Sequence, residues 1–398
     1  MTKDLLKLGF EVAPGDPCLF LHRTRELGVC LHVDDQLAMA KNDEEAAEFF
    51  GPNGIGKGRT MTYGPLRDSL NMDFEVEYTN DRRSIFVSQP RMARAILERA
   101  GLGDCNSVQT PAVPGRRYTK GSAPADEDER RQLAKEGLTP TYYNSITAAV
   151  NYLVAMTRKD MLFAVAKLSK YCRDPGRDNY NSLKHMLRFL KGTADYGVQF
   201  LWKADDPKPD DGPLTIEGYS DSSYCDDIDT AKSTEAHLIK VNGATVDARC
   251  KLGARVDSCV NHSETGAFLN IISQPKHVDT NTATDGGCES MMHVGRSIVW
   301  VRGIKAFLER RDVDSMPPTK VHVDNAGVLA MIKDSNMRHA NKHIYRTIAE
   351  ARERVNVDKC VFPCKIHTKL NLANALTKQE PCLKDSAEQL RQIAGPVA

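Results

Sequence analysis

The sequence of 398 residues predicts an α/β protein with more than one domain. After Pro213, strand and helix signals alternate, which is typical of an α/β domain with a mixed sheet. Two polar segments interrupt the chain: residues 110–140, which are rich in proline, glycine and charge, and the run KADDPKPDDGP, which ends at Pro213. The length agrees with about two or three domains.

The composition is that of an ordinary soluble globular protein, with 41% hydrophobic and 27% charged residues. No apolar run is long enough for a transmembrane helix, and the N-terminus lacks the apolar core of a signal peptide. A formal net charge of +1 gives no global indication of a nucleic-acid partner. Eleven cysteines without a secretory signal indicate reduced thiols, so we expect an intracellular protein without a membrane partner.

The first strands surround an unusual pair of acids. DPCLFLH and the two halves of GVCLHVDDQLAMA have strand character, with a tight turn at Asp34 and Asp35. Carboxylates inside an apolar run are costly unless they are exposed, hydrogen-bonded or bound to metal. A turn exposes both at a hairpin tip, where they are either ordinary turn residues or oxygen ligands for a divalent cation.

The next segments alternate in type. NDEEAAEFF predicts a helix capped by Asn42 or Asp43, LNMDFEVEY and SIFVSQP predict two strands, and PRMARAILERAGLG predicts a helix that begins near Pro90. Residues 113–140 predict a linker. KDMLFAVAKLSKYC and LKHMLRFLKG then show helical spacing, and GVQFLW predicts a strand.

Three acids in the C-terminal part occupy strand and helix ends. Asp221 lies in the strand-like GYSDSSY, Asp324 ends the strand of VHVDNAG, and Asp285 begins the long helix that ends at LERR. Carboxylates that converge from two strands and a helix can bind two Mg²⁺ ions roughly 3.5–4 Å apart and promote phosphodiester cleavage. Taken singly, Asp285 could be a helix cap and Asp324 a turn residue.

A second group has metal-ligand character. His339 and His343 share one face of a helical turn, and Cys360 and Cys364 follow them, so the four could bind zinc. The Cys-x3-Cys spacing is less usual for zinc than Cys-x2-Cys. We favour the alternative in which CVFPC is an apolar strand with small side chains.

Taken in order, these motifs resemble the C-terminal part of the polyprotein of copia-type LTR retrotransposons. DPCLF…GVCLHVDD is similar to the family's Tyr-Val-Asp-Asp hairpin, and GYSDSSYCDDIDTAKST, VHVDNAGVLAM, HANKHI and LANALTK follow in the family's order. The resemblance covers about residues 8 to 380. It implies a partial reverse transcriptase palm and helical connection, followed by a ribonuclease H-like, mixed five-stranded sheet with flanking helices.

The resemblance also implies domain boundaries. They are a partial palm at 1–112, a linker at 113–140, a helical thumb or connection region at 141–205, a ribonuclease H-like domain at 213–380 and a tail at 381–398. About 25 residues, 248–271, interrupt the family pattern and are expected to be an insertion. Glu264 within them is the rival of Asp285 for the second acidic position, and the spacing of Asp285 to Trp300 favours Asp285.

The resemblance assigns roles to six residues. Asp34 and Asp35 match the metal-binding pair of a polymerase palm, with His32 in place of the family's tyrosine. The ribonuclease H carboxylates carry over onto Asp221, Asp285 and Asp324, where Asp285 replaces a glutamate.

The fourth acidic position of the family falls on Asn374, which removes a negative charge from the site. The implied cofactor is Mg²⁺ or Mn²⁺. The implied partners are RNA–DNA hybrids, single-stranded RNA or DNA templates, and the N-terminal part of the polymerase. The implied location is the cytoplasmic retrotransposon particle or the nucleus.

We therefore expect a fragment of a reverse transcriptase and ribonuclease H polyprotein. Its residual activity, if it has any, would be Mg²⁺-dependent cleavage of RNA in RNA–DNA hybrids, with polymerase activity lost because fingers and half of the palm are absent. The alternative is a catalytically dead nucleic-acid-binding remnant of a degenerate element.

Overall fold

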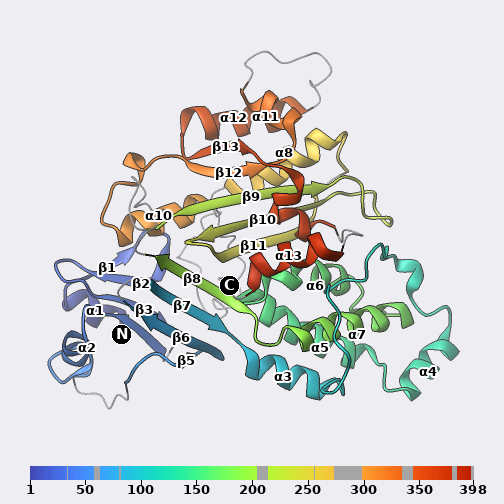
Figure 1. Cartoon of the computed structure of the whole chain (residues 1–398), viewed down its shortest axis with the longest axis horizontal. Helices are drawn as coiled ribbons and strands as arrows, with labels where there is room; N and C mark the ends of the chain where they lie inside the picture. The colour runs from blue at the N-terminus through green and yellow to red at the C-terminus, as the bar shows by residue number, and fades with distance from the viewer. Residues whose placement is uncertain are drawn as a thin grey trace. The chain divides into compact units, whose positions relative to one another are not determined.

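The protein has the α/β architecture that the sequence predicts (Figure 1). The computed structural model describes residues 1–33, 35–57, 63–79, 82–203, 214–254, 256–272, 298–333, 344–378 and 383–395. It divides into two compact units, and each consists of two chain segments. Unit 1 comprises residues 1–70 and 274–317, and unit 2 comprises residues 71–273 and 318–398.

Unit 1 is built on an antiparallel sheet in which β1, β2, β3 and β4 follow one another in chain order. Its elements are α1 (Thr2–Lys7), β1 (Phe10–Ala13), β2 (Asp16–His22), β3 (Gly28–His32), β4 (Asp35–Met39), α2 (Asp43–Phe50), β5 (Asp68–Ser69), α10 (Ile298–Leu308) and η4 (Val313–Ser315). Phe10, Phe20 and Val29 bury one sheet face against Phe49 of α2. As predicted, Asn42 caps α2, because its side chain accepts a 2.9 Å hydrogen bond from the Glu45 amide.

Helix α10 belongs to unit 1, although the sequence analysis placed it in the C-terminal domain. Its Trp300 Nε1 donates a 3.0 Å hydrogen bond to the carbonyl of Gly15, in the β1–β2 turn. Gly15 has φ +80°, and a Cβ there would lie 3.3 Å from the Trp300 ring. Arg310, just after α10, donates to the Arg25 carbonyl at 2.9 Å. The compact units therefore differ from the expected domains, because residues 274–317 belong to the same unit as residues 1–70.

The first part of unit 2 combines helices with the antiparallel strands β6, β7 and β8. Its elements are β6 (Met72–Tyr78), β7 (Arg82–Ser88), α3 (Pro90–Arg99), η1 (Lys120–Ser122), α4 (Glu127–Lys135), α5 (Pro140–Met156), η2 (Lys159–Met161), α6 (Leu162–Ser169), α7 (Arg177–Gly192) and β8 (Gly197–Lys203). Helix α4 lies where the sequence analysis expected a linker. Asp126 caps it by accepting from the Glu129 amide, and Leu133 anchors it in the core.

The second part of unit 2 confirms the predicted mixed five-stranded sheet, which has the order β11-β10-β9-β12-β13 (Figure 1). Strands β9, β10 and β11 are antiparallel, whereas β12 is parallel to both β9 and β13. The elements are β9 (Ile216–Ser223), β10 (Thr234–Val241), β11 (Ala244–Leu252), α8 (Val260–Ile272), β12 (Thr319–Val323), α11 (Ala326–Lys333), α12 (Tyr345–Arg352), η6 (Glu353–Val357), β13 (Val361–Lys365), η7 (Thr368–Leu370), η8 (Leu372–Leu376) and α13 (Leu383–Ala394).

Residues 248–271, which the sequence analysis treated as an insertion, form integral elements of this sheet. Ala248 to Leu252 pair with β10 as the second half of β11. Helix α8 packs against β9 and β10 through buried side chains that include Ala267, Phe268 and Ile271. The segment is therefore part of the folded core.

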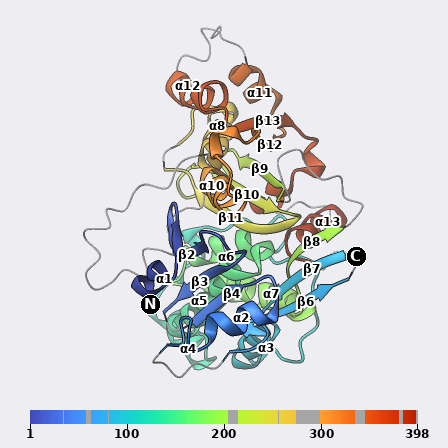
Figure 2. The same cartoon turned by 90° about the vertical axis from the view of Figure 1, so that its left-hand side faces the viewer.

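The helices of unit 2 and its five-stranded sheet share one core. Apolar residues of α5, α6 and α7 are in the same cluster as Leu238 of β10 and Leu376 of η8. Helices α6 and α13 both contact β11 (Figure 2). Lys167 of α6 also pairs with Asp226, in the β9–β10 loop, at 2.7 Å. The boundary expected between residues 205 and 213 is therefore not a boundary in packing. Among the described residues, no helix is long and apolar enough to cross a bilayer.

Candidate metal centre

Strand β9 carries the first acid of the candidate site. Asp221 lies near the end of this central strand and is 2% exposed. Its alternate neighbours Tyr219 and Glu217 share its face of the sheet, because side chains along a strand alternate between faces. A carboxylate buried at such a position requires hydrogen bonds or a cation to offset the loss of water.

Strand β12 brings the second acid next to the first. It runs parallel to β9 with His322 opposite Tyr219, so Asp324, the residue after β12, follows the same register toward Asp221. The Asp324 carbonyl accepts a hydrogen bond from Lys365 Nζ, and the Asn325 side chain accepts one from the Val328 amide at 3.1 Å. The chain therefore turns from β12 directly into α11, which holds Asp324 at the strand end.

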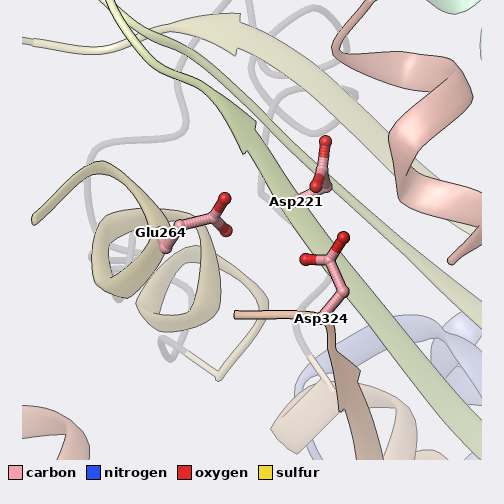
Figure 3. A group of neighbouring side chains, drawn as sticks. All are labelled: Asp221, Glu264 and Asp324. Carbon is pink, nitrogen blue, oxygen red and sulfur yellow. The ribbon is translucent and has the colours of Figure 1, made fainter. Parts of the chain in front are cut away.

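Helix α8 supplies the third acid, Glu264. Carboxylate oxygens of Asp221, Glu264 and Asp324 lie within 4.8 Å of one another, and the three side chains point toward the same space from β9, α8 and the end of β12 (Figure 3). Among the described residues, this is the one group of three or more acids, histidines or cysteines at such distances. The sequence predictions for Asp221 and Asp324 thus lead to a single place in the fold.

The three carboxylates of this group are buried close to one another, and this raises the pKa of Glu264. Burial, and then the negative charges of Asp221 and Asp324, raise the pKa of Glu264 from its ordinary value of 4.5 to about 9. Oε2 of Glu264 is buried and receives no hydrogen bond from the described residues. Hard oxygen donors of this kind suit Mg²⁺ or Mn²⁺, whose charge would offset both the repulsion and the missing hydrogen bond.

Glu264, which the sequence analysis named as the rival of Asp285, therefore stands beside the two aspartates. Asp285 lies outside the described residues, so its own position is not part of this geometry. The sequence did contain a signal for Glu264. In VNHSETGAFLNII, Glu264 precedes Ala267, Phe268 and Ile271 by three, four and seven residues, which places it on the buried face of α8.

The turn η8 lies against β9, the strand that carries Asp221. Asn374, at the position of the family's fourth acid, is 3% exposed, and η8 packs against β9 and β10. Thr377 follows this turn, and its hydroxyl donates a hydrogen bond to Oδ2 of Asp221. The sequence analysis singled out Asn374 but did not identify Thr377, because nothing local in LANALTK indicates which side chain faces β9.

The predicted polymerase pair lies elsewhere, at the β3–β4 hairpin of unit 1. Asp35 is the first residue of β4, pairs with His32 and is exposed, whereas Asp34 lies outside the described residues. The turn therefore falls one residue earlier than the sequence analysis placed it. Val33, the residue that follows β3, has a positive φ of +52°.

The alternative zinc tetrad remains incomplete in the described part of the chain. His339 and His343 lie outside it. Val361–Lys365 forms edge strand β13, which confirms that CVFPC is strand-like. Cys364 Sγ lies 3.6 Å from the Phe362 carbonyl, and Cys360 Sγ lies 3.6 Å from that of Arg354.

Comparisons with known proteins find relatives along almost the whole chain. The chain is 26% identical over 384 residues to the retrovirus-related Pol polyprotein from transposon TNT 1-94 of Nicotiana tabacum, which covers 96% of this chain and 25% of that protein. It is 24% identical over 387 residues to the Pol polyprotein from transposon RE2 of Arabidopsis thaliana, covering 94% and 22%.

A shorter match is the secreted RxLR effector protein 161 of Plasmopara viticola, 35% identical over 109 residues, which cover 27% of this chain and 71% of that protein. The chain therefore spans 25% or less of the length of the two Pol polyproteins it matches. No family model matches the chain, and no solved structure matches it.

Proposed function

Because the chain belongs to the copia-type retrotransposon polyproteins, we propose that unit 2 carries a ribonuclease H site. This site would cleave the RNA strand of an RNA–DNA hybrid in the presence of Mg²⁺ or Mn²⁺. The observation that carries the proposal is the convergence of Asp221, Glu264 and Asp324 on a mixed five-stranded sheet. In this proposal Glu264, and not Asp285, is the second acid of the site.

The three carboxylates would hold the cation through their oxygens. A bound divalent cation activates water and stabilises the leaving oxygen in phosphodiester cleavage. Glu264 must give up its proton to become a ligand, and a nearby positive charge lowers the pKa that burial and its neighbours raise. Asn374 is neutral, so Asp221, Glu264 and Asp324 would provide the negative charge of the site.

The proposed substrate is recognised by shape rather than by base sequence. A hybrid of RNA and DNA offers phosphates and 2′-hydroxyl groups along its minor groove, and contacts to these groups carry no sequence information. Single-stranded RNA or DNA lacks the paired geometry of the hybrid. We therefore propose the hybrid as the cleaved substrate, and single strands as weaker partners.

A polymerase role for Asp34 and Asp35 remains a prediction from the resemblance. Asp35 is exposed, and among the described residues it does not belong to any group of three or more potential ligands. The polymerase proposal therefore has less support in this chain than the ribonuclease H proposal does.

The neutral Asn374 favours a second candidate function, a hybrid-binding protein without cleavage. With an amide at the position of the family's fourth acid, the charge that would hold two dications is reduced. Such a protein would bind the hybrid with an affinity that falls steeply with salt, because cations are released from phosphates on binding. Metal-dependent cleavage separates the two functions.

The test is cleavage of a labelled RNA–DNA hybrid by the full chain, with Mg²⁺ and with Mn²⁺. The full chain is needed because the helices and the sheet of unit 2 share a core. We expect cleavage by the wild-type chain and a loss of about a hundredfold or more in Asp324→Asn, since metal ligands act as a unit.

Glu350→Gln, an exposed acid on α12, is the matched control and should cleave like the wild-type chain. Salt-sensitive hybrid binding by a folded wild-type chain that does not cleave would instead identify the second function.

A further inference from the structure

We propose that Thr377 is a positioning residue for the candidate metal centre, where its hydroxyl fixes the orientation of the Asp221 carboxylate. This inference rests on the proposed function of the same site. Thr377 is 1% exposed, and its Oγ1 donates a hydrogen bond to Oδ2 of Asp221. The two residues are 156 positions apart in the chain, so the contact is a product of the fold.

Two acceptors lie within hydrogen-bond distance of the Thr377 hydroxyl. Its oxygen also lies 3.1 Å from the carbonyl of Asn374, three residues earlier. A hydroxyl has a single proton to donate, and a bond to an ionised carboxylate is roughly twice as strong as a bond to a neutral carbonyl. A carboxylate that binds metal is ionised. The Thr377 hydroxyl therefore donates its proton to Asp221 rather than to the Asn374 carbonyl.

The backbone that carries Thr377 is fixed against β9. Asn371, which is fully buried, donates from Nδ2 to the carbonyl of Ser220 at 2.9 Å, and Ser220 directly precedes Asp221. Gln389 of α13 donates to the carbonyl of Lys369 at 2.9 Å and ties the start of the same segment to the last helix. These contacts hold η8 in one register along β9, so Thr377 stays opposite Asp221.

A fixed donor on one oxygen limits the rotation of the Asp221 carboxylate. The side chain is then already oriented toward Glu264 and Asp324 before a cation arrives, and less conformational entropy is lost on binding. Partners of metal ligands in this position typically change metal affinity about 10- to 100-fold when they are removed. Thr377 would thus act through Asp221 without touching the cation.

The test compares Mn²⁺ binding by titration calorimetry in the full-length wild-type chain, Thr377→Val and Thr377→Ser. Valine keeps the shape but removes the hydroxyl, and serine keeps the hydroxyl. We expect Thr377→Val to weaken Mn²⁺ binding about tenfold or more, and Thr377→Ser to remain within about threefold of the wild-type chain.

Thr245→Val is the matched control. Thr245 is a buried threonine of β11 in the same sheet, and its hydroxyl has no hydrogen-bond partner among the described residues. Thermal unfolding without metal shows whether each variant is folded. Thr245→Val should bind Mn²⁺ like the wild-type chain.

Two results would overturn the inference alone: Mn²⁺ affinity in Thr377→Val equal to that of a binding wild-type chain, or an equal loss in Thr377→Ser. A wild-type chain that is folded but does not bind Mn²⁺ would overturn the proposed function together with the inference. Weak binding in Thr377→Val that serine restores supports the positioning role, because a purely steric role would not depend on the hydroxyl.

Discussion

The β3–β4 hairpin of unit 1 and the carboxylate group of unit 2 carry acids with opposite environments. At the hairpin, Asp35 is exposed and pairs with His32 across the β3–β4 connection. The sequence singled it out because two aspartates are adjacent there. In unit 2, Asp221, Glu264 and Asp324 come from distant parts of the chain and meet within 4.8 Å. The hairpin acid therefore remains in water, whereas the fold brings the three acids of unit 2 together.

This difference has an energetic origin. An exposed carboxylate keeps its water and is stable without a partner, so an acidic turn by itself says little about metal binding. A buried group of like charges is costly, and the raised pKa of Glu264 is the direct expression of that cost. Proteins keep such groups where a ligand offsets the cost, which makes the unit 2 cluster the more informative of the two.

The largest expected effect is the difference in hybrid cleavage between a variant of Glu264, in the unit 2 cluster, and a variant of Asp35, at the hairpin. Glu264→Gln should reduce Mg²⁺-dependent hybrid cleavage about a hundredfold or more, because it removes one of the three proposed metal ligands. Asp35→Asn should cleave like the wild-type chain. The measurement is single-turnover cleavage of the labelled hybrid. Equal losses in the two variants would contradict the assignment of the reaction to unit 2.

A smaller effect concerns the pH dependence of stability without metal. The pKa of Glu264 is about 9 in the folded chain against an ordinary 4.5, so the unfolded chain loses this proton first as pH rises. Its contribution to stability is therefore complete below pH 4.5 and is lost progressively up to about pH 9. The loss is at most about 1.4 kcal/mol per pH unit.

Glu264→Gln should remove this contribution. In metal-free buffer, the difference in melting temperature between Glu264→Gln and the wild-type chain should grow from pH 5 to pH 8 in favour of the variant. Added Mg²⁺ should reduce the difference, because it stabilises the ionised form of the wild-type chain. A constant difference across this range would show that Glu264 is not held among like charges. Asp35→Asn should show no such trend.

Local signals predicted much of this architecture. Asn42 at the start of α2 and the strands on either side of the hairpin follow from caps and alternation, whereas the mixed five-stranded sheet was implied by the resemblance. Helix α4 was missed although Asp126 and Glu129 have the spacing of a helix cap, because the surrounding charge suggested a linker. In this segment the cap spacing indicated a helix and the composition indicated a linker, and the prediction followed the composition.

The site was predicted less completely, for a different reason. Asp221 and Asp324 occupy strand positions that a pattern can indicate, and the structure brings them together. The choice between Glu264 and Asp285 depends on how α8 packs on β9 and β10, and Thr377 depends on the register of η8. Both are long-range properties of the packed chain, which spacing along the sequence does not determine.

The smallest expected effect is at the hairpin connection, where Val33 is 78% exposed with φ +52°. A β-branched residue in this conformation is strained, whereas glycine adopts it freely. Val33→Gly should therefore stabilise the hairpin by about 1 kcal/mol or less, since part of the gain is lost to the greater freedom of glycine in the unfolded chain. Hydrogen exchange of the β3 and β4 amides should slow correspondingly, with hybrid cleavage unchanged. Faster exchange in Val33→Gly would mean that the valine side chain contributes contacts that outweigh its strained backbone.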